Sequence, residues 1–115
     1  MHVEKLKYTI WAADTARAIE FYTTVFGAEV VRHTQHIVEL EIAGGTIAIH
    51  DGGEGKTTWT GITLQVADVV VGAEAVKAAG GQCPHDPKPE NGEPPHLAMC
   101  SDTEGNQILL TRSRE

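Results

Sequence analysis

Residues 8–27 read YTIWAADTARAIEFYTTVFG, a stretch that predicts one strand, one turn and one helix. Leu6, Tyr8, Ile10 and Ala12 alternate with Lys5, Lys7, Thr9 and Trp11, which is the period of a strand whose first set of side chains is buried. Asp14 suits the N-cap of the helix, because its carboxylate can accept hydrogen bonds from free backbone N–H groups. Apolar residues follow at helical spacing, and Gly27 can take the left-handed conformation that ends a helix. The stretch therefore predicts a strand packed against an amphipathic helix.

A second stretch repeats this pattern with different residues. Residues 62–81 read ITLQVADVVVGAEAVKAAGG, which again predicts an alternating strand, a helix and terminal glycines. Asp68 takes the place of Asp14 as the capping residue. Strand–helix units are common, so a chance echo is the alternative to an internal duplication. The strands that follow each copy also match, which favours duplication.

The composition is that of one soluble domain. The chain has 115 residues, enough for one hydrophobic core but too few for two independent ones. Its formal charge of −7 opposes binding to the phosphate backbone of nucleic acids. No apolar run approaches a membrane span, and the N-terminus lacks the apolar core of a signal peptide. We therefore expect a cytoplasmic protein with no membrane or nucleic-acid partner. Cys83 and Cys100 can pair, but free thiols are the expectation in a chain without a secretion signal.

The rest of the chain predicts further strands and two connecting segments. The strands are expected at residues 28–32, 37–42, 46–50, 59–66, 96–101 and 107–111, with a brief edge strand near Gln82. Residues 51–57 are polar and glycine-rich, so they form the linker between modules 1–50 and 58–115 of a single domain, residues 1–115. All five prolines fall within residues 82–95, which predict a long surface loop that can fold over a cleft.

Two motifs in the chain resemble those of a known family. The first is D-x-x-x-A-x-x-F-Y-x-x-x-F-G, residues 14–27, and the second is D-x-x-G-N, residues 102–106. Together they are similar to the vicinal-oxygen-chelate superfamily, which includes glyoxalase I, bleomycin-resistance proteins and extradiol dioxygenases. Phe26 replaces the leucine usual in the family, and Thr103 replaces its usual proline. The resemblance implies an α+β fold in which two βαβββ modules form a curved mixed sheet around a groove, with helices outside it. It also implies a homodimer.

Metal-dependent members of this superfamily hold a divalent ion with four groove-facing side chains, usually histidine, glutamate or glutamine. The resemblance places these ligand positions at Lys7, Ala48, Gly61 and Leu109. An ammonium repels the ion, and the other three side chains offer no donor atom. His50, two residues along from Ala48, can contribute one ligand, which does not hold a catalytic metal. We therefore expect no cofactor in the groove; a divalent metal held by other ligands is the alternative.

Other chemistry has weaker support in the sequence. Cys83, His85, His96 and Cys100 are zinc-type ligands that flank the proline-rich loop, but their spacing matches no established zinc pattern. No serine, histidine and aspartate occur in a context typical of a catalytic triad. We therefore assign no catalytic residue.

Without a metal, the groove is a concave surface with indole rings, small polar groups and a few charges. The side chains expected to bind a ligand there are Lys7, Thr9, Trp11, His50, Trp59, Thr63, Gln65 and Leu109. Trp11 and Trp59 suit a planar aromatic ligand, because stacking adds roughly 1 kcal/mol to area burial; a cation can use the same ring faces. Lys7 is expected to pair with an anionic ligand group, or with Glu39 or Glu41, which otherwise form a solvated edge. An alternative interpretation places Trp59 at a dimer interface.

Three functions are consistent with such a groove. The first is a protein of the sequestration or resistance type, which binds a small planar aromatic compound in a metal-free groove. The compound can be neutral or cationic. The second is a metal-dependent lyase, isomerase or dioxygenase of the same superfamily with atypical ligands. The third is a non-catalytic structural module. For the first function, the expected partners are a small-molecule ligand and a second copy of the chain.

Overall fold

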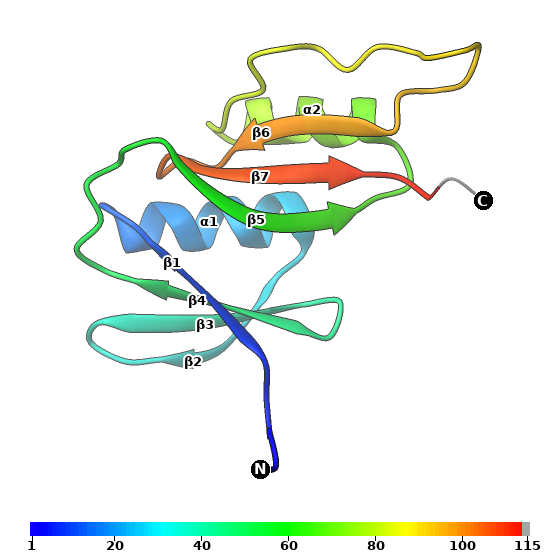
Figure 1. Ribbon diagram of the computed structural model, residues 1–115. Coiled ribbons are helices and arrows are strands. Elements are labelled where there is room, and N and C mark those ends of the chain that lie inside the picture. Colours follow the sequence, from blue (N-terminus) through cyan, green and yellow to red (C-terminus); the bar gives the residue numbers. More distant parts are fainter. Residues whose placement is uncertain (114–115) are drawn as a thin grey trace.

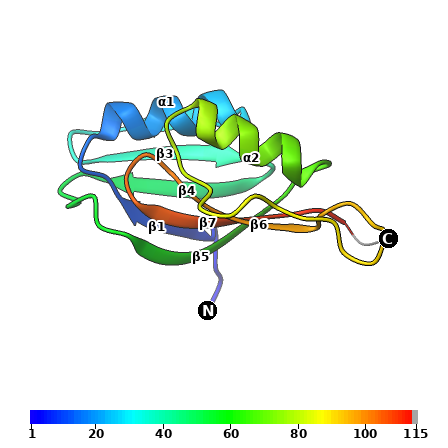
Figure 2. The same cartoon turned by 90° about the horizontal axis from the view of Figure 1, so that it is seen from above.

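The computed structural model describes residues 1–113, in which two helices lie on one side of two small mixed sheets (Figure 1, Figure 2). The elements follow the chain as β1 (Lys7–Trp11), α1 (Thr15–Phe26), β2 (Glu29–His33), β3 (Ile37–Ile42), β4 (Gly45–His50), β5 (Thr58–Gln65), α2 (Val69–Ala78), β6 (Leu97–Ser101) and β7 (Asn106–Thr111). Neither helix in these 113 residues is long and apolar enough to cross a membrane.

Each sheet combines one parallel pair of strands with antiparallel neighbours. The first sheet has the order β1-β4-β3-β2, and the second has the order β5-β7-β6. In both sheets the strand before the helix lies parallel to the last strand, β1 beside β4 and β5 beside β7. The α+β class with mixed sheets, which the resemblance implied, is confirmed. Figure 2 shows α1 and α2 on the same side of the sheets.

The capping residues lie where the local pattern predicted them. Asp14 has extended backbone, and its carboxylate accepts a 3.0 Å hydrogen bond from the Arg17 N–H. Asp68 does the same for α2, accepting from the backbone N–H groups of Val70 and Val71 at 2.9 and 3.1 Å. Gly27 ends α1 in the left-handed region with φ +65°. Free backbone donors at each helix start are therefore satisfied by a side chain two or three residues away.

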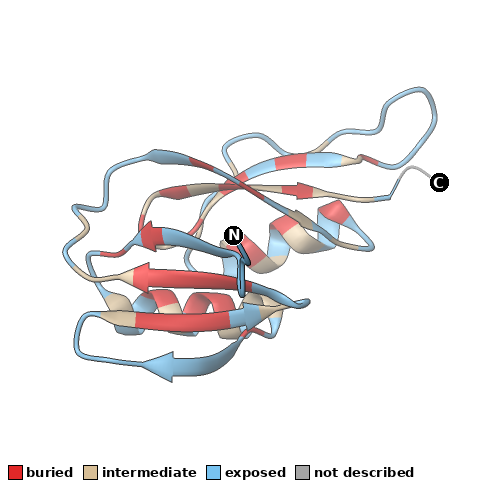
Figure 3. Ribbon diagram, turned by 60° about the horizontal axis from the view of Figure 1, so that its bottom comes forward, coloured by how far each residue is buried: buried red, intermediate tan, exposed pale blue. Residues whose placement is uncertain are grey.

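The core lies between the helices and the helix-facing sides of the sheets (Figure 3). Its largest fully buried side chains are Tyr22, Phe21, Leu40, Ile49, Ile108, Leu110, Val38, Val69, Val76 and Cys100. Strand alternation predicted most of this set, but it also predicted buried positions for Leu6 and Tyr8. Those two predictions were wrong, because Leu6 precedes the first ladder pair of β1 and Tyr8 lines surface hollows.

The second sheet has one strand fewer than the first. The edge strand expected near Gln82 is reduced to a single bridge with Ser101. Proline lacks a backbone N–H, so the proline-rich residues that follow cannot extend this pairing into a ladder. The long segment between α2 and β6 is therefore a loop, as predicted from its composition.

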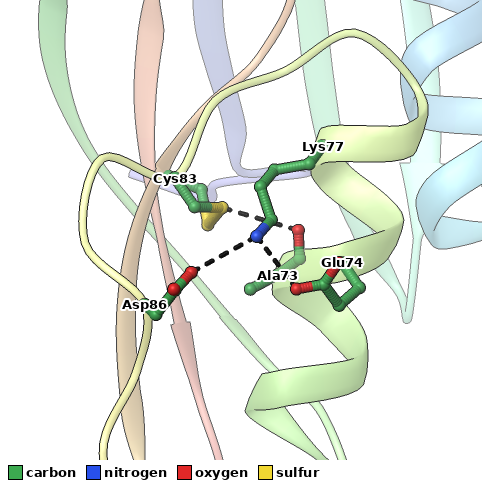
Figure 4. Close-up of a disulfide and its surroundings, with 6 residues drawn as sticks. Ala73, Glu74, Lys77, Cys83 and Asp86 are labelled. Carbon is green, nitrogen blue, oxygen red and sulfur yellow. Dashed lines mark hydrogen bonds and ion pairs between the residues drawn. A yellow bond between two sulfur atoms is a disulfide. The ribbon is translucent and has the colours of Figure 1, made fainter.

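Cys83 and Cys100 form a disulfide, so the prediction of free thiols was wrong. The bridge between Gln82 and Ser101 holds the two backbones side by side, with reciprocal N–H to C=O bonds of 3.0 and 2.7 Å. The Cα atoms of the two cysteines are consequently 4.3 Å apart. Figure 4 shows the disulfide near Lys77 of α2, whose ammonium contacts Asp86 of the loop at 3.3 Å. The disulfide closes the base of the proline-rich loop.

Candidate functional site

The face of the first sheet that points away from the helices carries the polar residues of β1. Lys7, Thr9 and Trp11 alternate along β1 with the buried Ile10. The strand register places Thr9 beside Ala48, Ala48 beside Glu39, and Glu39 beside Arg32. These four residues form one row across the sheet. Trp11 and His50 form the beginning of the next row.

An aromatic pair stands at the end of β1 and β4. The rings of Trp11 and His50 are stacked, with centroids 5.9 Å apart and an interplanar angle of 27°. His50 Nδ1 also lies 2.7 Å from the backbone oxygen of Asp51, which orients the imidazole. The Asp51 carboxylate lies 2.8 Å from His36 Nδ1, and this hydrogen bond is the main cause that lowers the pKa of Asp51. Trp11 remains 51% exposed, so its outer face is open to a ligand.

Next to this pair is a charged group that we call the Glu39 cluster: Glu39, Lys5, Lys7 and Arg32. The Glu39 carboxylate is 3.3 Å from Lys5 Nζ, 3.4 Å from Lys7 Nζ and 3.2 Å from Arg32 Nη1. Its side chain is only 4% exposed, whereas the three cations are about half exposed. The hydrogen bond from Arg32 is the largest cause of the lowered pKa of Glu39, and those from Lys5 and Lys7 add to it.

The predicted pairing of Lys7 with Glu39 is therefore confirmed. Glu39 and Glu41 were expected to form a solvated edge. This prediction was wrong for Glu39, which is buried, whereas Glu41 is exposed as expected. Sequence alternation placed both carboxylates on one face but did not show that three cations converge on the first.

The two tryptophans line one hollow of about 480 Å³, which we call the tryptophan hollow. Its walls include Tyr8, Thr9 and Trp11 from β1 and Trp59 from β5, together with residues 52–56 of the connecting segment. Glu104 and Asn106 also belong to its lining. Trp59 is 57% exposed, so an indole on each side is available for contact.

A second hollow of about 760 Å³, the junction hollow, lies between the two sheets. It brings together Lys7 from β1 with Thr63 and Gln65 from β5, and it is lined mainly by apolar side chains such as Phe26 at the end of α1. The predicted ligand-binding set is thus divided between two hollows. His50 and Leu109 line neither of them, while Tyr8, which alternation placed in the core, lines both.

The late D-x-x-G-N motif ties the end of β1 to α1. The Tyr22 hydroxyl donates a 2.6 Å hydrogen bond to Asp102 Oδ2. Asp102 also accepts from the backbone N–H groups of Glu104 and Asn106 at 2.7 and 3.0 Å. The Asn106 side-chain amide donates to the backbone oxygen of Trp11 at 2.9 Å. This chain of bonds holds the backbone of Trp11 at the edge of the tryptophan hollow. Burial, followed by the nearby Asp102 charge, raises the pKa of Tyr22 well above its usual value.

Glu104, a variable position of that motif, is the functional neighbour that sequence reasoning missed. Its buried carboxylate accepts from Arg17 Nε at 2.7 Å, from the Asp14 backbone N–H at 2.9 Å and from the Thr103 hydroxyl at 2.7 Å. Burial by itself raises the pKa of Glu104, but these donors outweigh it, so the pKa lies below the usual value. No local periodicity relates residue 104 to residue 17, so no sequence signal pointed to this pair.

The residues at the four expected metal positions do not fit a divalent ion. Lys7 carries a cation that contacts Glu39, and Ala48 and Leu109 have no donor atoms. Gly61 has φ +78° within a register irregularity between Trp59 and Thr63, where a ligand side chain would strain the backbone. Among residues 1–113, no three His, Cys, Asp or Glu side chains gather closely enough to hold a metal ion.

Two curated relatives are similar to the chain over most of its length. They are named "Probable lactoylglutathione lyase" and come from Vibrio parahaemolyticus and Vibrio cholerae. Each is 26% identical and matches 89% of this chain and 85% of its own length.

Solved structures show the same fold at low sequence identity. The fosfomycin resistance protein FosX of Listeria monocytogenes superposes with a TM-score of 0.80 at 21% identity, covering 100% of this chain and 94% of its own. The bleomycin resistance determinant encoded on transposon Tn5 superposes with a TM-score of 0.71 at 16% identity, covering 98% and 100%. The family model described as "Glyoxalase/Bleomycin resistance protein/Dioxygenase superfamily" matches residues 2–110. The chain therefore belongs to the glyoxalase/bleomycin resistance protein/dioxygenase superfamily.

Proposed function

We propose that this protein binds a small planar aromatic compound in a metal-free groove, as a sequestration or resistance protein does. One observation carries the proposal: Trp11 and Trp59, each about half exposed, line the same hollow of about 480 Å³. Indole faces stack on planar rings with a gain of about 0.5–1.5 kcal/mol beyond area burial. A hollow of this size is within the range of small-molecule sites.

The other predicted residues receive supporting roles in this proposal. Thr9 lies within the tryptophan hollow, where its hydroxyl can bond a polar edge of the ring. Lys7, Thr63 and Gln65 line the junction hollow, which Tyr8 connects to the first. His50 supports the Trp11 ring, and Leu109 extends the face beside Thr63.

Relatives in the superfamily support this class of function. One structural neighbour is a bleomycin resistance determinant and another is a fosfomycin resistance protein, a variant of which has been crystallised with Mn(II). Their resistance role supports the proposal, whereas its metal-free character rests on the residues of this chain. Structural likeness at such low sequence identity shows a shared fold, and a shared resistance function is our proposal for this chain. The misfit of the four metal positions favours binding over metal-dependent chemistry.

Calorimetric titration with a panel of one- to three-ring aromatic compounds tests the proposal. We expect at least one compound to bind, and Trp11→Ala and Trp59→Ala each to weaken it about tenfold through lost stacking and area. Val71→Ala, an exposed apolar truncation on α2, is the matched control and should leave affinity unchanged. If no compound binds, the result favours the non-catalytic structural module. If a compound binds but neither Trp11→Ala nor Trp59→Ala lowers its affinity, the ligand binds elsewhere.

A metal-dependent lyase is the second candidate, favoured by the names of the two Vibrio relatives. Elemental analysis of protein purified without chelator separates the two candidates. We expect well under one equivalent of divalent metal per chain, and unfolding that is indifferent to chelator. One tightly bound equivalent, with lactoylglutathione lyase activity that a chelator abolishes, would establish the second candidate instead.

We further propose a single domain with modules 1–50 and 58–115 joined by residues 51–57, working as a cytoplasmic homodimer. Light scattering after gel filtration tests the dimer, and a Trp59→Glu variant tests whether Trp59 lies at its interface. In a cytoplasmic protein the Cys83 and Cys100 thiols should be reduced in the cell, whereas a disulfide there would indicate an oxidising compartment. Cell fractionation combined with thiol labelling therefore decides the location.

A further inference from the structure

The Glu39 cluster places more positive than negative charge in the row next to Trp11 on the first sheet. One buried carboxylate meets three cations, Lys5, Lys7 and Arg32, in a chain whose formal charge is −7. Each lysine donates one hydrogen bond to Glu39, and so does Arg32, although an ammonium has three donors and a guanidinium five. The three side chains are between 43% and 63% exposed, so their remaining donors face open space.

The acids on the side of the tryptophans have partners of their own: Glu104 pairs with Arg17, Glu54 with Lys56, and Asp51 with His36. The remaining acids of this face lie on the other side of the cluster. Glu41 lies in the Thr46 and Lys7 row, with Glu29 beside it on β2. That row is on the opposite side of the Glu39 row from Trp11. An approaching ligand whose ring rests on Trp11 therefore meets the cations before it meets these acids.

Strand β1 connects the cluster to the tryptophan hollow. Trp11 and Thr9 line this hollow, and Lys7 is the next residue on the same side of the strand. Successive residues on one side of a strand are about 7 Å apart. Lys7 is two such steps from Trp11, about 13 Å between the Cα atoms. Its ammonium, however, lies 3.4 Å from the Glu39 carboxylate, whose row is one step from the Trp11 row, so a two-ring aromatic compound that rests on Trp11 can present a charged substituent toward it.

We propose that the ligand is an aromatic anion, a planar ring system bearing a carboxylate or a similar group that Lys5, Lys7 and Arg32 bind. The inference rests on the proposed function, because it names the class of compound for the same site. Glu39 acts as a positioning residue: it gathers the three cations and leaves their outer donors for the ligand. Hydrogen bonds between such cations and an anion are about twice as strong as neutral ones. A cationic aromatic ligand is disfavoured, since the cluster repels it.

Three naphthalene derivatives of nearly equal shape test the inference: 2-naphthoate, neutral 2-naphthamide and cationic 2-naphthylmethylammonium. We expect the anion to bind about tenfold more tightly than the amide, and the cation most weakly. Raising the salt concentration from 50 to 300 mM should weaken naphthoate binding and leave naphthamide binding unchanged.

Variants identify the cations responsible. Lys7→Gln and Arg32→Gln should each weaken naphthoate binding about three- to tenfold and leave naphthamide binding unchanged, which a purely structural role would not produce. Lys88→Gln, which removes the same charge from the distant proline-rich loop, is the matched control and should change neither affinity.

Each remaining outcome counts against the inference. Equal binding of the anion and the amide would overturn it while leaving the proposed function in place, as would preference for the cation. An equal loss with Lys88→Gln would show a long-range charge effect rather than a site. Failure of all three compounds to bind, together with the wider aromatic panel, would overturn both proposals.

Discussion

The hydroxyl of Tyr22, on α1, donates a 2.6 Å hydrogen bond to the buried carboxylate of Asp102, eighty residues further along the chain. The bond joins the helix beside the first sheet to the turn that enters the last strand of the second. Asp102 in turn accepts from Asn106, whose side chain bonds the backbone of Trp11. The motif residues that indicated the family therefore hold the two sheets together beside the proposed ligand site.

Tyr22→Phe is expected to destabilise the protein by about 1–3 kcal/mol, because it removes a donor from a buried carboxylate without changing the ring. Urea unfolding followed by circular dichroism measures this loss. Tyr8→Phe is the matched control, since Tyr8 is partly exposed and has no hydrogen-bonded side-chain partner among those described. A loss below about 0.5 kcal/mol for Tyr22→Phe would show that water replaces the hydroxyl.

Glu104→Gln should destabilise the protein by about 1–3 kcal/mol, because the charge-assisted bonds from Arg17 weaken. The pH dependence gives an independent check. The folded pKa of Glu104 lies below the ordinary 4.5, so its ionised form stabilises the fold above pH 4.5. That contribution is lost as the pH falls through the lower folded pKa. The wild-type protein should therefore lose stability more steeply than the variant as the pH falls below 4.5; parallel curves would contradict the assignment.

Reduction of the Cys83–Cys100 disulfide should lower the free energy of unfolding by about 2–3 kcal/mol. The two cysteines are separated by 17 positions, and cross-links of this span remove loop entropy of that size from the unfolded chain. Cleavage by endoproteinase Glu-C after Glu90, in the enclosed loop, should accelerate on reduction. Cys83→Ser provides the control, because reductant should then have no further effect on either measurement.

Gly81→Ala should destabilise the protein by about 1–3 kcal/mol, because a Cβ there would lie 2.5 Å from the Ser101 oxygen and 2.9 Å from Phe21 Cε1. Neither contact can be relieved without moving α1 or β6. Gly45→Ala is the matched control, with its nearest contact at 3.4 Å and an ordinary φ, and should cost well under 1 kcal/mol. Thermal unfolding compares the two, and equal losses would contradict the steric argument.

The sequence by itself determined the local elements and the family. Both helices start at the aspartates that the capping pattern indicated, and α1 ends at Gly27 as predicted. Capping and amphipathic periodicity act between residues two to four positions apart, so a linear reading contains all that they require. The sequence also contains the reason why the edge strand near Gln82 is interrupted, because the prolines that follow lack the backbone N–H groups that a ladder requires.

Tertiary structure alone decided the contents of the site. Lys7 and Glu39 are 32 positions apart, Tyr22 and Asp102 are 80 apart, and Arg17 and Glu104 are 87 apart. The disulfide depends likewise on a bridge formed across the loop between α2 and β6. Alternation assigns a residue to one side of a strand but does not state which partners the neighbouring strands bring to it. Strand order and register, which no local pattern encodes, decided three features of the site. They bury Glu39, expose Tyr8 and divide the groove into two hollows.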